Sequence, residues 1–137
     1  LLRQAGEQGL TVPMMGPEGV GNPEINAIAG DSVEGMLLTL PADFSTNPDN
    51  AAIVKAFADN KRDASGAFQM TAFAAAQVLI DSMKAVGNDP EKVADHLHAN
   101  SFDTPLGNIS WNKAGDLNSF EFEIFKWHKD GSKSLAK

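Results

Sequence analysis

Apolar residues recur at spacings of three and four over residues 68–86, which is the pattern of an amphipathic helix. Gln77, Asp81 and Lys84 fall on another face of that helix. The pattern predicts that the buried stripe consists of Phe68, Ala72, Ala75, Ala76, Leu79, Met83 and Val86. We therefore expect the longest helix of the chain here, with its alanines packed closely against a neighbouring element.

Four further helices are predicted from shorter patterns. The chain opens inside a helix that ends near Gly9, and a second short helix covers residues 23–29 and stops at Gly30. Asn47-Pro48 signals the start of a third helix, whose buried stripe contains Ile53, Val54 and Phe57. A fourth begins at Asn88-Asp89-Pro90-Glu91, turns Val93, Ala94 and Leu97 inward, and stops near Asn100.

Strands are predicted in four places. Residues 10–15 form an apolar run that indicates the end of a buried strand, and residues 35–40 fit a strand buried on both faces, as in a parallel sheet. Two later strands cover residues 109–112 and 120–128. On the last strand Phe120, Phe122 and Ile124 share one face, opposite Glu121 and Glu123, until Phe125 and Trp127 bring apolar character to the acidic face. Residues after the Asp130-Gly131 turn are expected to be frayed.

The mixed order of helices and strands is typical of part of a doubly wound α/β protein. These strands do not close a sheet by themselves, and the first helix has no polar capping residue before it. Both features predict that the chain is a fragment. Residues 41–49 are polar and rich in turn formers, which indicates a linker or hinge.

Composition narrows the classes of function. A net charge of −7 and a pI near 4.8 argue against a nucleic-acid partner, because phosphate backbones require clustered Lys and Arg. No apolar run approaches the roughly 20 residues that span a bilayer. The absence of cysteine excludes disulfides and thiolate chemistry. A length of 137 residues suffices for one domain with a core.

Glu18 is the most informative polar residue. It lies in a loop of Gly and Pro, residues 16–22, just past the predicted strand of residues 10–15. Open α/β sheets bind ligands at the carboxyl ends of their strands, so the loop suggests a receptor for a small molecule with a positive end. The alternative is a solvated loop acid. The glycine spacing matches no phosphate-binding motif, and Glu18 would repel phosphate.

Other candidate sites lack a complete constellation. His96 and His98 point in different directions on a helix and have no third ligand, so we expect no metal site. Glu121 and Glu123 are spaced as a glycosidase pair might be, but nothing separates their pKa values, and a solvated face is expected. Phe68 is either part of the core or an apolar wall for a ligand side chain. We expect no cofactor and no enzymatic activity.

An ordered set of motifs resembles the branched-chain amino-acid (Leu/Ile/Val) binding proteins. The resemblance runs over essentially the whole chain but covers only the C-terminal two-fifths or so of such a protein. The motifs are Met15-Gly16-Pro17-Glu18-Gly19-Val20-Gly21, Ile28-Ala29-Gly30-Asp31, Glu34-Gly35-Met36-Leu37, Asp63-Ala64-Ser65-Gly66, Gly115-Asp116-Leu117 and Phe125-Lys126-Trp127-His128.

The resemblance implies part of a type I periplasmic-binding fold, in which two doubly wound α/β lobes close on an amino acid. Residues 1–40 and 121–137 would belong to the second lobe and residues 41–120 to the first, with crossovers near both ends of the middle segment. Glu18 matches the acid that pairs with the ligand ammonium, and Phe68 matches the aromatic position beside the ligand side chain. The family's other ligand contacts lie upstream of Leu1, so this chain should hold half a site.

The family implies a periplasmic receptor that delivers its amino acid to the membrane permease of an ABC importer. An alternative with the same fold is a ligand-sensing domain of a regulator or receptor, and a third class is a hydrolase using Glu121 or Glu123. An incomplete lobe exposes apolar surface and unpaired strand edges. We therefore expect the isolated chain to associate with itself or with the missing N-terminal half.

Overall fold

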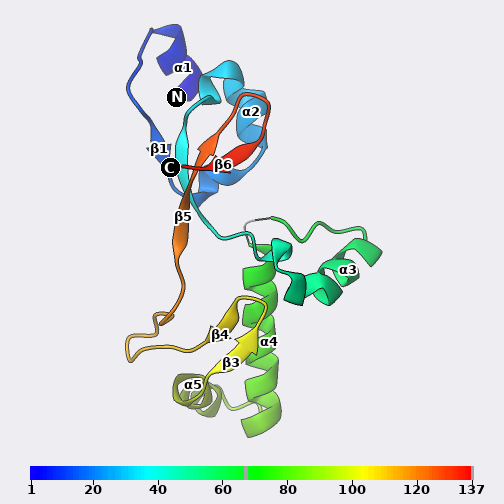
Figure 1. Ribbon diagram of the computed structural model, residues 1–137. Helices are drawn as coiled ribbons and strands as arrows, with labels where there is room; N and C mark the ends of the chain where they lie inside the picture. Colours follow the sequence, from blue (N-terminus) through cyan, green and yellow to red (C-terminus); the bar gives the residue numbers. More distant parts are fainter. Residues whose placement is uncertain (67, 137) are drawn as a thin grey trace. The chain divides into compact units, whose positions relative to one another are not determined.

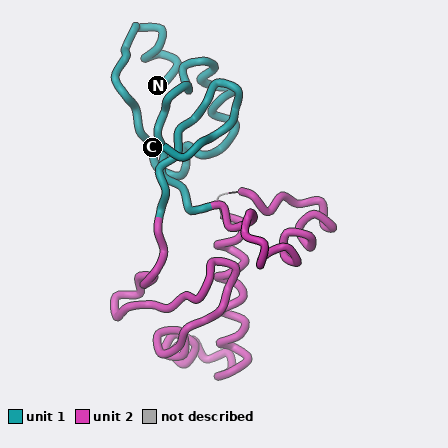
Figure 2. Tube along the Cα trace, in the orientation of Figure 1, with its two compact units in different colours: residues 1–42, 122–137 teal, residues 43–121 magenta. Residues whose placement is uncertain are grey.

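The computed structural model describes residues 1–66 and 68–136, and the chain divides into two compact units (Figure 2). Unit 1 comprises residues 1–42 and 122–137, and unit 2 comprises residues 43–121. The hinge positions expected near Pro41 and Phe120 lie next to these boundaries. That the units are pieces of a second and a first lobe stays a prediction.

Unit 1 is built on a mixed four-stranded sheet with the order β1-β2-β5-β6 (Figure 1). Strand β1 runs parallel to β2, whereas β5 is antiparallel to both β2 and β6. The elements of this unit are α1 (Leu2–Glu7), β1 (Met15–Gly16), η1 (Glu18–Gly21), α2 (Glu24–Ala29), η2 (Gly30–Val33), β2 (Leu37–Pro41), β5 (Phe122–Trp127) and β6 (Lys133–Leu135). The predicted α/β class is confirmed.

The core of unit 1 lies around Val33, Leu38 and Trp127, whose side chains are fully buried. Leu38 and Leu40 alternate with the half-buried Leu37 and Thr39, so the apolar run of residues 35–40 does form a central strand. Its neighbours are parallel on one side and antiparallel on the other, rather than parallel on both.

Two strand predictions for unit 1 are wrong, and the face pattern predicted for the last strand is seen in β5. Residues 10–15 are not a buried strand: Leu10 and Val12 are about half exposed, and the ladder with β2 begins only at Met15. On β5 Phe122 and Ile124 share one face as predicted, and that face is exposed, whereas Trp127 on the opposite face is fully buried. The chain after Asp130-Gly131 is not frayed but forms β6.

Unit 2 consists of helices and a β-hairpin. Its elements are η3 (Phe44–Thr46), η4 (Pro48–Asn50), α3 (Ala51–Asp59), α4 (Gln69–Val86), α5 (Pro90–Ala99), β3 (Phe102–Thr104) and β4 (Gly107–Ile109). The two later helix starts are confirmed with their caps: the Asn47 side chain accepts the Asp49 N–H, and Asp89 accepts those of Glu91 and Lys92. None of the described helices is long and apolar enough to cross a membrane.

Helix α4 is confirmed, but its buried face is not the predicted one. The buried residues of α4 are Met70, Ala74, Val78 and Ser82, and the helix contacts α5 and β3. Of the predicted stripe, Phe68, Leu79 and Met83 are 52%, 46% and 40% exposed. Ser82 tolerates full burial because its hydroxyl oxygen lies 3.2 Å from His96 Nδ1 on α5. The more apolar face of α4 is therefore left open in this chain.

Candidate functional site

Glu18 lies immediately beyond the carboxyl end of β1. Strand β1 ends at Gly16, Pro17 follows in an extended conformation, and Glu18 begins the short 3-10 turn η1. The Glu18 side chain is exposed and makes no ion pair with any part of the chain that the structure describes. A carboxylate at the end of a strand that runs parallel to its neighbour is positioned to meet a cationic group.

The backbone of η1 is fixed by hydrogen bonds from the end of the chain. The indole Nε1–H of Trp127 donates to the carbonyl oxygen of Val20 at 2.9 Å. The ammonium of Lys133 donates to the carbonyl oxygen of Gly21 at 3.0 Å and lies 4.6 Å from the centroid of the Trp127 ring. The turn that carries Glu18 is thus held by residues of β5 and β6.

Two of the glycines around η1 allow a close approach within the protein. A Cβ on Gly16 would lie 2.8 Å from Val20 Cγ2, and one on Gly21 would lie 2.8 Å from Leu40 Cδ2. A Cβ on Gly19 would meet nothing within 4 Å. At Gly16 and Gly21 the close neighbours are therefore side chains of unit 1 itself.

Phe68 lies in unit 2, where it occupies the N-cap position of α4. Its side chain is 52% exposed, so it is not a core residue of this chain. Just before it, the backbone N–H and hydroxyl of Ser65 donate to Asp63, and these bonds lower the pKa of the Asp63 carboxyl below its usual value. Glu18 and Phe68 thus belong to different units, and both are accessible.

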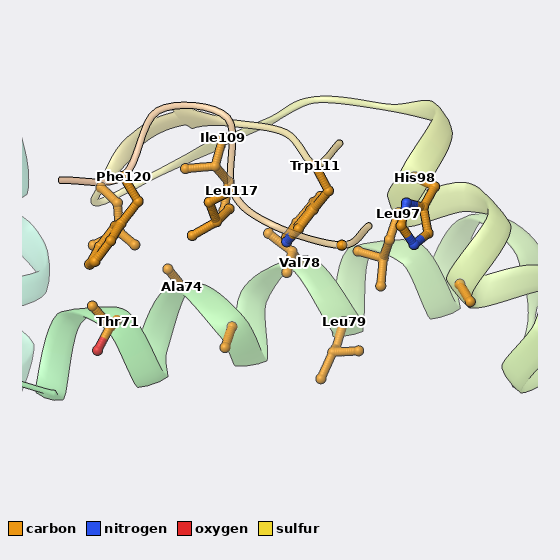
Figure 3. A pocket seen from close by; sticks show the side chains of 14 residues that line it. Thr71, Ala74, Val78, Leu79, Leu97, His98, Ile109, Trp111, Leu117 and Phe120 are labelled. Atoms are coloured by element: carbon orange, nitrogen blue, oxygen red, sulfur yellow. The ribbon is translucent and has the colours of Figure 1, made fainter. Parts of the chain in front are cut away.

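Unit 2 also contains an apolar pocket of about 460 Å³. Figure 3 shows Ile109, Trp111, Leu117 and Phe120 above α4, with Leu97 and His98 contributed by α5. The other lining residues are Thr71, Ala74, Ala75, Val78, Leu79, Ala94, Leu106 and Gly115. The lining carries no carboxylate and no ammonium or guanidinium group. It therefore suits apolar groups rather than a zwitterion.

Sequence reasoning missed this pocket because its residues come from separate segments between 71 and 120. One feature of the sequence pointed toward the pocket: helix α4 has more apolar residues around its circumference than one packed face requires.

The three histidines make separate contacts. His96 pairs with Ser82, and His98 borders the apolar pocket. His128 Nδ1 lies 3.2 Å from Glu34 Oε1, whose carboxylate also accepts the Lys129 N–H at 2.8 Å. The hydrogen bond from the Lys129 N–H is the main reason that the pKa of Glu34 lies below its usual 4.5, and the hydrogen bond with His128 lowers it further. Within residues 1–66 and 68–136, no group of three His, Asp or Glu side chains could hold a metal ion.

Glu121 and Glu123 do not share one face of a regular strand. Strand β5 begins at Phe122, so Glu121 precedes it as an exposed residue, whereas Glu123 is a half-buried member of the strand. The description of the two carboxylates as a pair on one strand face was therefore wrong.

Comparison with known proteins assigns the chain to a family. Residues 1–132 match the periplasmic binding protein family. The whole chain is 49% identical to a leucine-, isoleucine-, valine-, threonine- and alanine-binding protein of Pseudomonas aeruginosa and 44% identical to a Leu/Ile/Val-binding protein of Escherichia coli. It covers 37% of the length of each.

A solved structure agrees with this match. The crystal structure of a leucine binding protein from Thermotoga maritima superimposes with a TM-score of 0.80 at 25% identity, covering 99% of this chain and 39% of that one. The α/β fold is thus part of a type I periplasmic-binding fold that is incomplete in these 137 residues. The chain belongs to the periplasmic binding protein family.

Proposed function

We propose that this chain is the C-terminal portion of a periplasmic solute receptor, which binds a branched-chain or related amino acid and delivers it to the membrane permease of an ABC importer. The observation that carries the proposal is the match of the complete chain, at 44–49% identity, to relatives named for binding these amino acids. The receptor is not an enzyme. Residues 1–40 and 121–137 contribute to its second lobe and residues 41–120 to its first.

In this proposal the Glu18 carboxylate pairs with the ammonium group of the ligand. Removing a zwitterion from water is costly unless each charge finds a partner. The exposure of Glu18 and its position at the end of β1 support the assignment, because the carboxylate is not engaged in an ion pair elsewhere in the described chain. Groups outside this chain bind the ligand carboxylate.

Phe68 supplies an apolar surface for the ligand side chain. An aromatic ring that is 52% exposed at the start of a helix offers contact area without a rearrangement of the core. Burying that area against an aliphatic side chain is favourable by about 25 cal/mol per Å². This role explains why an apolar residue stands at an N-cap position, where a polar residue is usual.

The rest of the receptor covers the open apolar surface of unit 2. The exposed residues Phe73, Leu79, Ile80 and Met83 of α4 and the apolar pocket beside them support this assignment. Because the chain spans only 37% of its curated relatives, polypeptide of the remaining length is the natural partner for that surface. The isolated chain should therefore associate with the missing portion.

Calorimetric titration of leucine tests the proposal in a full-length protein that contains this chain. Such a protein can be a chimera in which these residues replace the matching part of the Pseudomonas aeruginosa relative. Glu18→Gln should weaken leucine binding by roughly 30-fold or more, because it removes one partner of a desolvated charge pair. Phe68→Ala should weaken it by about tenfold.

The matched control is Glu24→Gln, which alters an exposed acid on α2 six positions away. Its affinity for leucine should equal that of the parent protein. If Glu18→Gln and Glu24→Gln bind leucine equally well, the proposed role of Glu18 is wrong.

A further inference from the structure

The turn η1 has little regular structure of its own to fix the direction of Glu18. Strand β1 before it has only the two residues Met15–Gly16, and η1 itself is a 3-10 turn of four residues. Its internal support includes the Val20 N–H, which donates to the Pro17 carbonyl at 3.1 Å. An exposed carboxylate on such a turn can bind a ligand tightly only if other residues fix the backbone beneath it.

That fixation comes from Trp127, the last residue of β5. Its side chain is fully buried, and its indole N–H donates to the Val20 carbonyl, two residues after Glu18. The backbone N–H of Trp127 also donates to the carbonyl oxygen of Met36, so the residue is hydrogen-bonded through both its main chain and its side chain. An indole that is fixed in this way holds Val20 rigidly rather than following its motion.

Lys133 on β6 binds the same turn. Its ammonium lies over the Trp127 ring and donates to the Gly21 carbonyl, so two consecutive carbonyls of η1 are bound by two neighbouring strands. We propose that Trp127 is a positioning residue, whose hydrogen bond to Val20 sets the direction of the Glu18 carboxylate toward the ligand ammonium. This inference rests on the proposed function of Glu18.

The test uses Trp127→Phe in the full-length protein and two ligands that differ at one group. Leucine carries the ammonium, whereas 4-methylpentanoate has the same carbon skeleton and carboxylate without it. Loss of the indole hydrogen bond should weaken leucine binding by about fivefold and leave the affinity for 4-methylpentanoate within about twofold. A general loss of stability would weaken both ligands alike.

A double-mutant cycle with Glu18→Gln makes the test sharper. If Trp127 acts through Glu18, Trp127→Phe should cost leucine affinity in the parent protein but not in the Glu18→Gln background. The amides of residues 18–21 should also exchange faster with solvent in Trp127→Phe without ligand. Should the phenylalanine variant fail to fold, β-(3-benzothienyl)alanine at position 127 keeps the shape of the indole, lacks the N–H, and should give the same pattern.

Equal losses for both ligands, an undiminished loss in the Glu18→Gln background, or no loss at all would overturn the positioning role while leaving the proposed function intact. Wild-type leucine affinity in Glu18→Gln alone would instead overturn the proposed function, and the role of Trp127 with it. The leucine affinity of the Glu18→Gln variant therefore distinguishes failure of the positioning role from failure of the proposed function.

Discussion

The side-chain amide of Asn50 donates to the carbonyl oxygen of Pro105 at 2.9 Å, and the same nitrogen donates to the Phe44 carbonyl at 2.8 Å. Asn50 is only 4% exposed, although it lies where η4 passes into α3. One buried side chain thus joins the start of unit 2 to the turn between β3 and β4. Removing it leaves two acceptors without their donor.

Asn50→Ala should therefore lower the free energy of unfolding of unit 2 by about 1–3 kcal/mol. The control is Asn60→Ala, which removes an exposed hydrogen bond to Ala56 and should cost about 0.5 kcal/mol or less. Each unit contains one of the chain's two tryptophans, Trp127 in unit 1 and Trp111 in unit 2. Urea titration of 5-fluorotryptophan-labelled chain, followed by ¹⁹F NMR, should show an earlier transition of the Trp111 signal. An unchanged midpoint for Asn50→Ala would contradict the role of this bond.

Gly21 and Gly19 provide a matched pair on the Glu18 turn. Gly21→Ala brings a methyl group against Leu40, which should destabilise unit 1 by about 1–3 kcal/mol, whereas Gly19→Ala meets open space and should change stability by less than about 0.5 kcal/mol. The Trp127 ¹⁹F signal reports the difference. Equal midpoints for the two variants would show that η1 does not pack against β2 as described.

Stability of unit 1 should decrease in acid through Glu34. The pKa of Glu34 is lowered from its usual 4.5 by the Lys129 N–H and His128, so the unfolded state takes up the proton first as the pH falls. The contribution of Glu34 is complete above pH 4.5 and is lost as the pH falls through the lower pKa of the folded state.

Glu34→Gln should reduce this pH dependence without abolishing it, because hydrogen bonds from Ser132 also lower the pKa of Asp130. The unfolding midpoint of the Trp127 signal, measured from pH 6 to pH 3, gives the slope. Glu24→Gln, which changes an exposed acid on α2, serves as the control variant. If the unfolding midpoint of Glu34→Gln depends on pH as steeply as that of the parent chain, Glu34 does not contribute to the acid sensitivity of unit 1.

The open face of α4 should drive association with the missing portion of the receptor. Ile80 is 52% exposed, so Ile80→Glu should leave the fold of the chain intact but weaken its binding to that portion by about tenfold or more. Lys84→Glu, an exposed change on the same helix, is the control. Size-exclusion chromatography with light scattering measures the complex. A chain that remains a sharp monomer in the presence of the missing portion would contradict this prediction.

Local sequence signals were sufficient for much of the fold. Asn47 and Asp89 identified the beginnings of two helices, because each accepts backbone N–H groups within its own segment. The apolar run of residues 35–40 also predicted the strand β2 correctly, although only Leu38 and Leu40 are buried along its alternating positions and Leu37 and Thr39 are half-buried.

The wrong predictions concern features that depend on packing between segments far apart in the sequence. The buried face of α4 depends on where α5 and β3 pack, and β6 exists only because β5 provides a ladder for its residues. The same holds for the site. Glu18 was predicted from its own loop and stays a proposal, whereas the Trp127 and Lys133 bonds to that loop span 107 and 112 positions and leave no local pattern.

The most direct measurement is a crystal structure of the full-length protein with leucine bound. If Glu18 pairs with the ligand, the leucine ammonium should lie about 2.7–2.9 Å from a carboxylate oxygen of Glu18, as in a charge-assisted hydrogen bond. A leucine whose ammonium is held by other groups, with Glu18 still facing solvent, would contradict it.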